Sequence, residues 1–261
     1  MKLVHKAFAP PTPAGRAGRR LAALLSAFAA LLALHGLAVA GGSACADDHC
    51  IDGRPVNVHA AAGATWAIAE PSPGTYRFEL RPGDRWSGDR GAARERAELS
   101  FDEVPVRFGV LYRVSYEMRI EGTAPVRSQW MAAGQWHATE DAGDAASSPP
   151  LGLSLEGRDL IVFTQSEGAA QHTKNPPAVV RARVRNIARN RWIPVSYDVR
   201  FDWRRGWLAV TIGGRRLFAG EIPIGYNDAV GPYFKFGIYR APTPQTLVLQ
   251  YRNLTIREVG H

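Results

Sequence analysis

Three short segments of the sequence carry polar side chains that a packed β-strand does not need. In residues 233–239 (YFKFGIY), strand alternation places Tyr233, Lys235 and Tyr239 on one face and three apolar side chains on the other. Gly237 leaves room between Lys235 and Tyr239 on the polar face. This face offers a positive charge and two phenols, which suit an acidic ligand and proton transfer.

Two further segments repeat the pattern. Residues 96–99 (RAEL) point Arg96 and Glu98 to one face, and residues 135–137 (QWH) do the same with Gln135 and His137. If all three segments are strands of one concave sheet, their polar faces line a single groove. Each segment alone is better explained as the solvated face of an ordinary strand, so the prediction depends on the set.

The elements that must position these side chains are predicted to be strands. Period-two alternation dominates from about residue 60 onward, and helical periodicity is scarce. We predict strands at residues 76–80, 96–101, 111–120, 128–137, 151–155, 159–165, 193–201, 207–212, 233–239 and 247–256. Turns rich in glycine and proline separate them, so we predict an all-β fold, a β-sandwich of jelly-roll type with a concave groove.

The three polar segments, in this order, resemble the signature strands of the jelly-roll polysaccharide lyases. The matching residues are RAEL at 96–99, QWH at 135–137 and YFKFGIY at 233–239. Heparin lyase I, glucuronan lyase and, more distantly, alginate lyases belong to this group. The resemblance spans most of residues 75–256 and looks closest to the heparin-lyase-like branch.

This resemblance implies β-elimination at a uronic acid of an anionic polysaccharide. The C5 proton of the sugar becomes acidic only when its carboxylate is neutralised, which is the implied role of Gln135 and Arg96. His137, with an ordinary pKa of ~6.5, is one candidate base, and an ionised Tyr239 is the other. Tyr239 is also the candidate acid for the leaving oxygen. The implied substrate-binding residues are Lys235, Tyr233 and Glu98.

A second basic element places Arg181, Arg183 and Arg185 at alternate positions. As a strand it would present arginines to an anionic chain, although a solvated sheet edge explains the pattern equally well. We therefore predict Arg181 and Arg183 as substrate-binding residues. His172 lies in the preceding loop, where it can close over a substrate, and His59 is interpreted as a surface residue.

The N-terminus has the form of an export signal. Residues 1–20 hold five basic residues and no acidic one, an apolar run follows at 21–34, and Ala38-Val39-Ala40 resembles a cleavage site. An uncleaved membrane anchor is the alternative. We predict a signal peptide at 1–40 and an exported protein, periplasmic or secreted, without membrane contact after cleavage. The chain's charge of +8 then falls to 27 basic against 24 acidic residues, +3, so nucleic acid is not an expected partner.

The rest of the chain is predicted to be a short segment at 41–59 followed by one domain at 60–261. Cys45 and Cys50 are expected to form a local disulfide in an oxidising compartment, and they make a poor zinc pattern with His49. We expect no metal or cofactor, with a structural calcium ion left open, and a monomeric protein.

Two other functions are compatible with the same sequence pattern. A non-catalytic, lectin-like carbohydrate-binding module can use the same sandwich, but it has no need for Gln135, His137 and Tyr239 together. Its sugar-stacking candidates are Trp86, Trp130, Trp136 and Trp203. A glycoside hydrolase needs paired carboxylates, and Glu98 has no evident partner.

Overall fold

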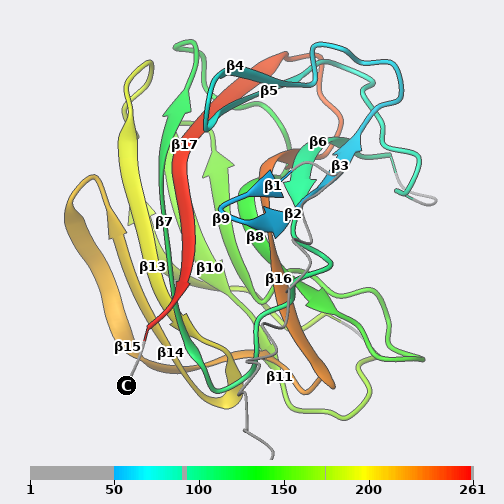
Figure 1. The fold of residues 1–261 in the computed structure, drawn as a ribbon, viewed down its shortest axis with the longest axis vertical. Helices are drawn as coiled ribbons and strands as arrows, with labels where there is room; N and C mark the ends of the chain where they lie inside the picture. The colour runs from blue at the N-terminus through cyan, green and yellow to red at the C-terminus, as the bar shows by residue number, and fades with distance from the viewer. Residues whose placement is uncertain (1–49, 90–92, 174, 260–261) are drawn as a thin grey trace, which may run out of the picture. The chain divides into compact units, whose positions relative to one another are not determined.

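Two β-sheets packed face to face build the fold (Figure 1). A computed structural model describes residues 50–89, 93–173 and 175–259, which belong to one compact unit. The predicted signal peptide and Cys45 lie outside the described residues, and so the export signal and the disulfide remain predictions. The part of the chain that the structure describes contains no helix long and apolar enough to cross a membrane.

The first sheet carries the three polar segments, and we call it the groove sheet. Its seven strands lie in the order β12-β10-β9-β8-β16-β6-β3. Their bounds are β3 (Asn57–Ala60), β6 (Glu95–Ser100), β8 (Met131–Thr139), β9 (Leu151–Glu156), β10 (Asp159–Thr164), β12 (Val179–Val184) and β16 (Val230–Arg240).

The second sheet covers the back of the first. Its eight strands follow the order β11-β15-β14-β13-β7-β17-β5-β4, and a separate short pair joins β1 (Cys50–Ile51) to β2 (Arg54–Pro55). The bounds are β4 (Ile68–Ser72), β5 (Thr75–Leu80), β7 (Leu111–Ile120), β11 (Ser166–Glu167), β13 (Ile193–Arg200), β14 (Asp202–Ile212), β15 (Arg215–Tyr226) and β17 (Leu247–Glu258).

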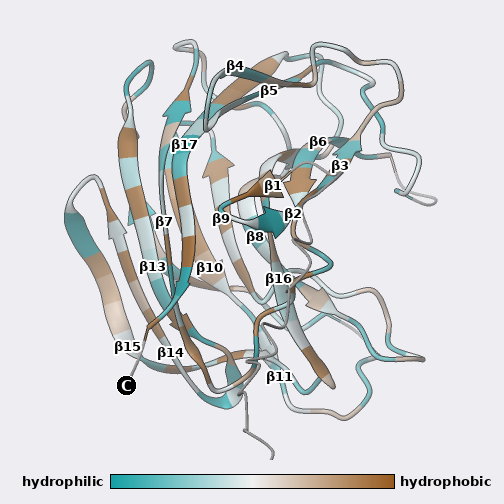
Figure 2. Cartoon of the chain, in the orientation of Figure 1, coloured by the Kyte–Doolittle hydropathy of each residue, from teal (hydrophilic) through white to brown (hydrophobic). Residues whose placement is uncertain are grey.

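The core lies between the sheets because alternate residues of each strand turn inward. Figure 2 shows this alternation as apolar and polar bands along the strands. In the groove sheet, Trp136 packs 5.3 Å from Phe234 and 5.2 Å from Phe201, measured between ring centroids. Burying such large rings supplies the main driving force for folding. It also fixes which residues of β8 and β16 must face the opposite way.

The predicted all-β sandwich is confirmed, and each of the ten predicted strands corresponds to an observed one. The sequence pattern missed β1, β2, β3, β4, β11 and β15. Four residues are too few for β3 to show alternation, and glycine and proline interrupt the pattern of β15. The groove sheet therefore begins at Asn57, before the boundary predicted at residue 60.

Gly237 has a different role from the one predicted. Its φ is +129°, a conformation that favours glycine. A Cβ atom there would lie 2.3 Å from the carbonyl oxygen of Ala97 and 2.8 Å from the Cα of Glu98. Gly237 thus allows β16 to approach the backbone of β6, rather than making room on the polar face.

Candidate active site

Strand register brings the three predicted segments together. β16 lies between β6 and β8 and pairs with both. The facing pairs are Tyr239 with Arg96, Lys235 with Gln135, and Tyr233 with His137. Each pair joins a polar residue of β16 to a polar residue of a neighbouring strand, so the polar faces of all three strands are continuous.

These faces form the floor of a groove of about 690 Å³. Its walls come from the loops around Trp86, Trp130 and Ser147. Another hollow, of about 720 Å³, lies against β3 and β4, but its lining is largely apolar, with Glu70 as its one described carboxylate. Of these two hollows, judged by their described lining residues, the groove alone combines acids, bases and hydrogen-bond donors, so we take it as the candidate active site.

Glu98 lies beneath the groove floor, where it holds three polar side chains in place. Its carboxylate accepts hydrogen bonds from Arg96 Nη1 and Gln135 Nε2, both at 2.7 Å, and lies 3.4 Å from Lys235 Nζ. Burial alone would raise the pKa of Glu98, but Lys235, Arg96 and Gln135 outweigh it and hold that pKa below its usual value. Because Glu98 is fully buried, we reassign it from substrate contact to positioning.

Arg96 binds two carboxylates, which compensate its charge. Its Nε and Nη2 donate to Asp89 at 2.9 and 2.6 Å, while Nη1 donates to Glu98. Asp89, Arg96, Glu98 and Lys235 therefore form a buried set of two cations and two anions, which we call the groove ion cluster. Sequence patterns missed Asp89 because it lies in a loop without periodicity.

The geometry of His137 suits a general base. Its Nδ1 lies 2.7 Å from the carbonyl oxygen of Ala138, which can only accept, so Nδ1 carries the ring proton and Nε2 the lone pair. Burial and then the positive charge of Lys235 lower the pKa of His137. The ring stacks on Tyr233 at 5.2 Å and is neutral at pH 7.

Tyr239 is better placed as an acid than as a base. Burial raises the pKa of its phenol, although Arg96 and Arg94 oppose the shift, so the hydroxyl keeps its proton near pH 7. The guanidinium carbon of Arg96 lies 3.7 Å from the centre of the Tyr239 ring. In the strand register, Tyr239 and His137 lie toward opposite ends of the polar face, with their Cα atoms about 16 Å apart.

His59 belongs to the same groove, and its interpretation as a surface residue is wrong. It faces Glu98 across the β3–β6 pair, is 7% exposed and stacks on Trp86 at 3.9 Å. Burial, followed by the charge of Lys235, lowers the pKa of His59 to about 4. The groove thus holds two neutral histidines at pH 7.

Several predicted residues lie elsewhere. Arg181 donates to Thr164 at 2.8 Å, and Arg183 pairs with Glu156 and Asp159 at the sheet edge. Neither arginine lines the groove, so their substrate-binding role remains a prediction without support from the geometry. Trp136 is buried in the core and cannot stack on a sugar. His172 is also buried, and it contacts carboxylates instead of the groove.

Comparison with known structures identifies similar folds. An endo-β-1,4-glucuronan lyase from the fungus Trichoderma reesei is 13% identical, with a TM-score of 0.60 over 81% of this chain and 91% of that one. Alginate lyase A1-II′, of polysaccharide lyase family 7, is also 13% identical, with a TM-score of 0.56 over 75% and 84%. At these identities the likeness establishes the jelly-roll fold. No curated protein sequence matches the chain.

The sequence itself matches a protein family. The family model for polysaccharide lyases aligns with residues 69–254, which include β6, β8 and β16 and hence the whole groove floor. The match covers more than half of the chain and contains every strand that contributes to the groove ion cluster. The chain belongs to the polysaccharide lyase family, whose members are enzymes that cleave polysaccharides.

Proposed function

We propose that this lyase cleaves a polymer of uronic acid by β-elimination in the groove. His137 removes the C5 proton through Nε2, and Tyr239 donates its phenolic proton to the leaving glycosidic oxygen. The observation that carries the proposal is the tautomer of His137, because the Nδ1 contact with Ala138 leaves Nε2 as the basic nitrogen. The protonated Tyr239 then completes an acid–base pair.

Gln135 and Lys235 are the groups best suited to neutralise the uronate carboxylate. Gln135 uses one amide N–H on Glu98 and has a second to donate. Lys235 adds charge next to it in the β8–β16 register. Two carboxylates already compensate the charge of Arg96, and its guanidinium lies over the Tyr239 ring, so we reassign it from carboxylate binding to the placement of Tyr239.

Similar structures support a uronate substrate. The two lyases named above act on glucuronan and on alginate. The alginate lyase was also solved with substrate after one histidine and one tyrosine had been replaced, in a structure with a TM-score of 0.56 at 13% identity over 75% of this chain and 83% of that one. A histidine and a tyrosine are also the acid–base pair proposed here.

The charge of the groove favours carboxylate polymers over heavily sulfated ones. Among the described lining residues, the cations are Arg94, Arg96 and Lys235, and the anions are Asp89, Asp102 and Glu140. Glu98 adds a further negative charge below them. A polymer with several sulfates per disaccharide would need an excess of cations that these residues do not supply.

A substrate screen tests this function. The purified chain is incubated with glucuronan, alginate, hyaluronan and heparin, and the unsaturated product is followed by its ultraviolet absorbance. We expect cleavage of a non-sulfated polyuronate and little or none of heparin. Preferential cleavage of heparin would contradict the substrate class, and binding of every polymer without cleavage would contradict the reaction.

Two variants test the assigned residues. His137→Ala and Tyr239→Phe should each reduce kcat by about 10²–10⁴-fold, the usual contribution of a general acid or base. Tyr233→Phe is the matched control, because it removes a phenol from the same groove and strand, and we expect less than about a tenfold loss. A larger loss in Tyr233→Phe than in Tyr239→Phe would transfer the acid role to Tyr233.

Export and a monomeric state complete the proposal. The residue pattern at 1–40 supports export to the periplasm or the outside of the cell. Sequencing the N-terminus of the mature protein should find Gly41 as its first residue, and an intact Met1 in the exported fraction would contradict cleavage. Light scattering of the mature protein should give the mass of one chain.

A further inference from the structure

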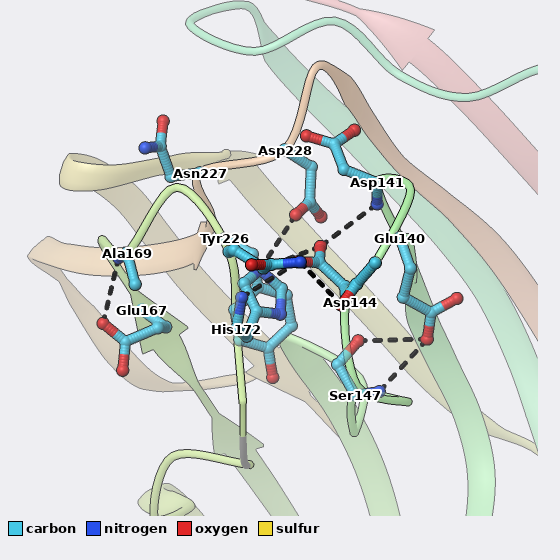
Figure 3. Close-up of polar contacts among 12 residues, drawn as sticks. Glu140, Asp141, Asp144, Ser147, Glu167, Ala169, His172, Tyr226, Asn227 and Asp228 are labelled. Atoms are coloured by element: carbon cyan, nitrogen blue, oxygen red, sulfur yellow. Dashed lines mark hydrogen bonds and ion pairs between the residues drawn. The ribbon is translucent and has the colours of Figure 1, made fainter. Parts of the chain in front are cut away.

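A buried cluster outside the groove brings together Asp144, His172 and Asp228, and we call it the Asp–His–Asp cluster (Figure 3). Asp144 comes from the connection between β8 and β9, His172 from that between β11 and β12, and Asp228 from the turn between β15 and β16. No step of the proposed elimination uses these residues. Their convergence from three separate connections therefore needs its own explanation.

The geometry of the cluster centres on one nitrogen atom. His172 Nε2 lies 3.0 Å from Asp228 Oδ1 and 3.6 Å from Asp144 Oδ2. A ring nitrogen carries at most one proton, which can serve the nearer carboxylate but not both. Ligand atoms that surround one small cation at about 2.1 Å are themselves roughly 3.0–3.4 Å apart. The two distances to Nε2 are at or slightly above this range, and all three ligand atoms lie within 4.8 Å of one another, close enough to converge on a common ion.

The charge of the cluster leads to the same conclusion. The side chains of His172, Asp144 and Asp228 are 3%, 1% and 3% exposed, respectively. The single imidazole of His172 faces two buried carboxylates. No lysine or arginine of the described ranges pairs with these carboxylates. Buried carboxylates without a compensating cation are strongly unfavourable.

Other contacts hold the ligand atoms in place. Asp144 Oδ1 accepts the backbone N–H of His172 at 2.9 Å, and Oδ2 accepts that of Asp141 at 3.1 Å. Nδ1 of His172 has no hydrogen-bond partner among the described residues, so these hydrogen bonds orient the carboxylate of Asp144 and not the imidazole ring. Orientation of a carboxylate ligand by surrounding hydrogen bonds is typical of metal sites.

We propose that the Asp–His–Asp cluster binds one divalent transition-metal ion, Zn²⁺ or Mn²⁺, through His172 Nε2 and one oxygen each of Asp144 and Asp228. The imidazole suits Zn²⁺ and the two carboxylates suit Mn²⁺, whereas Ca²⁺ prefers oxygen ligands alone. This proposal departs from the expectation of no metal, which rested on the sequence alone. The ion would join three connections, one of which continues into Ser147 and Ser148 at the groove wall, so its role is to fix that wall.

Metal titration of the EDTA-treated and desalted full chain tests this site. Zn²⁺, Mn²⁺ and Ca²⁺ are added separately as the metals alone, with binding followed by calorimetry and Tm by thermal unfolding. We expect one equivalent of Zn²⁺ or Mn²⁺ to bind more tightly than Ca²⁺ and to raise Tm by about 5–10 °C at 100 times its Kd. Absence of binding by Zn²⁺ and Mn²⁺, or tighter binding of Ca²⁺, would overturn the proposal.

Two substitutions locate the bound ion. Asp228→Asn keeps the shape of the ligand but removes its charge, and it should weaken binding at least tenfold. Asp198→Asn makes the same change at the exposed pair with Arg113 on the other sheet and should leave binding unchanged. Equal affinity in wild type and Asp228→Asn would place the metal elsewhere and overturn the assignment. Binding is measured without substrate, so this outcome is independent of the lyase assay.

Discussion

The two buried ionic clusters of this protein differ in how their charges are compensated. In the groove ion cluster, Arg96 and Lys235 neutralise Asp89 and Glu98 within the protein itself. The Asp–His–Asp cluster offers one titratable histidine to two carboxylates. The first cluster is electrically complete, and it can therefore hold catalytic side chains in position without an external ion. The second cluster needs a cation from solution to compensate its carboxylates.

Removing the charge of Glu98, the central anion of the groove ion cluster, should have the largest effect on stability. Glu98→Gln leaves Lys235 buried without its carboxylate partner, and we expect the free energy of unfolding to fall by about 3–5 kcal/mol. Denaturant unfolding at neutral pH measures this loss. Glu117→Gln breaks a more exposed pair with Arg252 and should cost less than about 1 kcal/mol. Equal losses would show that burial of the cluster has no energetic consequence.

Lowering the pH should destabilise the fold through protonation of His59. The pKa of His59 is about 4 in the folded protein and 6.5 in the unfolded chain. As the pH falls, the unfolded chain therefore protonates His59 before the folded protein does. The contribution of His59 to the free energy of unfolding is therefore complete above pH 6.5, and up to about 3 kcal/mol of it is lost as the pH drops toward 4. His59→Gln should flatten this part of the stability curve. Parallel curves for both proteins would exclude His59 as the cause.

Asp89 offers a matched comparison between a buried and an exposed ion pair. Asp89 and Asp198 each bind an arginine through both carboxylate oxygens, at 2.6 and 2.9 Å. Asp89→Asn should cost about 1.5–3 kcal/mol because its hydrogen bonds to a charged group are buried. Asp198→Asn should cost less than about 1 kcal/mol. Chemical denaturation of both variants measures the difference, and a reversed order would contradict it.

The smallest effect on stability is expected from a substitution in the Asp–His–Asp cluster of the metal-free protein. Asp228→Asn removes one of two poorly compensated carboxylates, so stability should change by less than about 1 kcal/mol or increase. Thermal unfolding of the EDTA-treated protein measures it. A loss as large as that of Glu98→Gln would mean that His172 alone compensates both acids, and the contrast between the clusters would disappear.

The strand pattern of the groove sheet was predictable because packing dictates it. Phe234, Phe236 and Ile238 must face the core, which leaves Tyr233, Lys235 and Tyr239 on the groove side whatever their chemistry. The same reasoning placed Gln135 and His137. A period of two residues is thus sufficient to locate a side chain on a sheet face.

The alternation of side chains along a strand does not predict how deeply a side chain is buried or which residues it contacts. Alternation shows that Glu98 shares a face with Arg96, but only the paired strands on both sides reveal that Glu98 is fully buried. Asp89 and the Asp–His–Asp cluster depend on loops, whose path follows from contacts between distant residues. His59 was missed for a related reason, since β3 has only four residues.

The place of β16 in the groove sheet has a consequence for the order of assembly during synthesis. β6 and β8 are made first but never pair with each other, because β16 lies between them and ends only at Arg240. A ribosome that has completed residue 139 has produced Gln135 and His137 without the lysine and tyrosine that complete the groove. Long-range strand pairing of this kind forms slowly. The nascent chain is therefore inactive until β16 has emerged and inserted between β6 and β8.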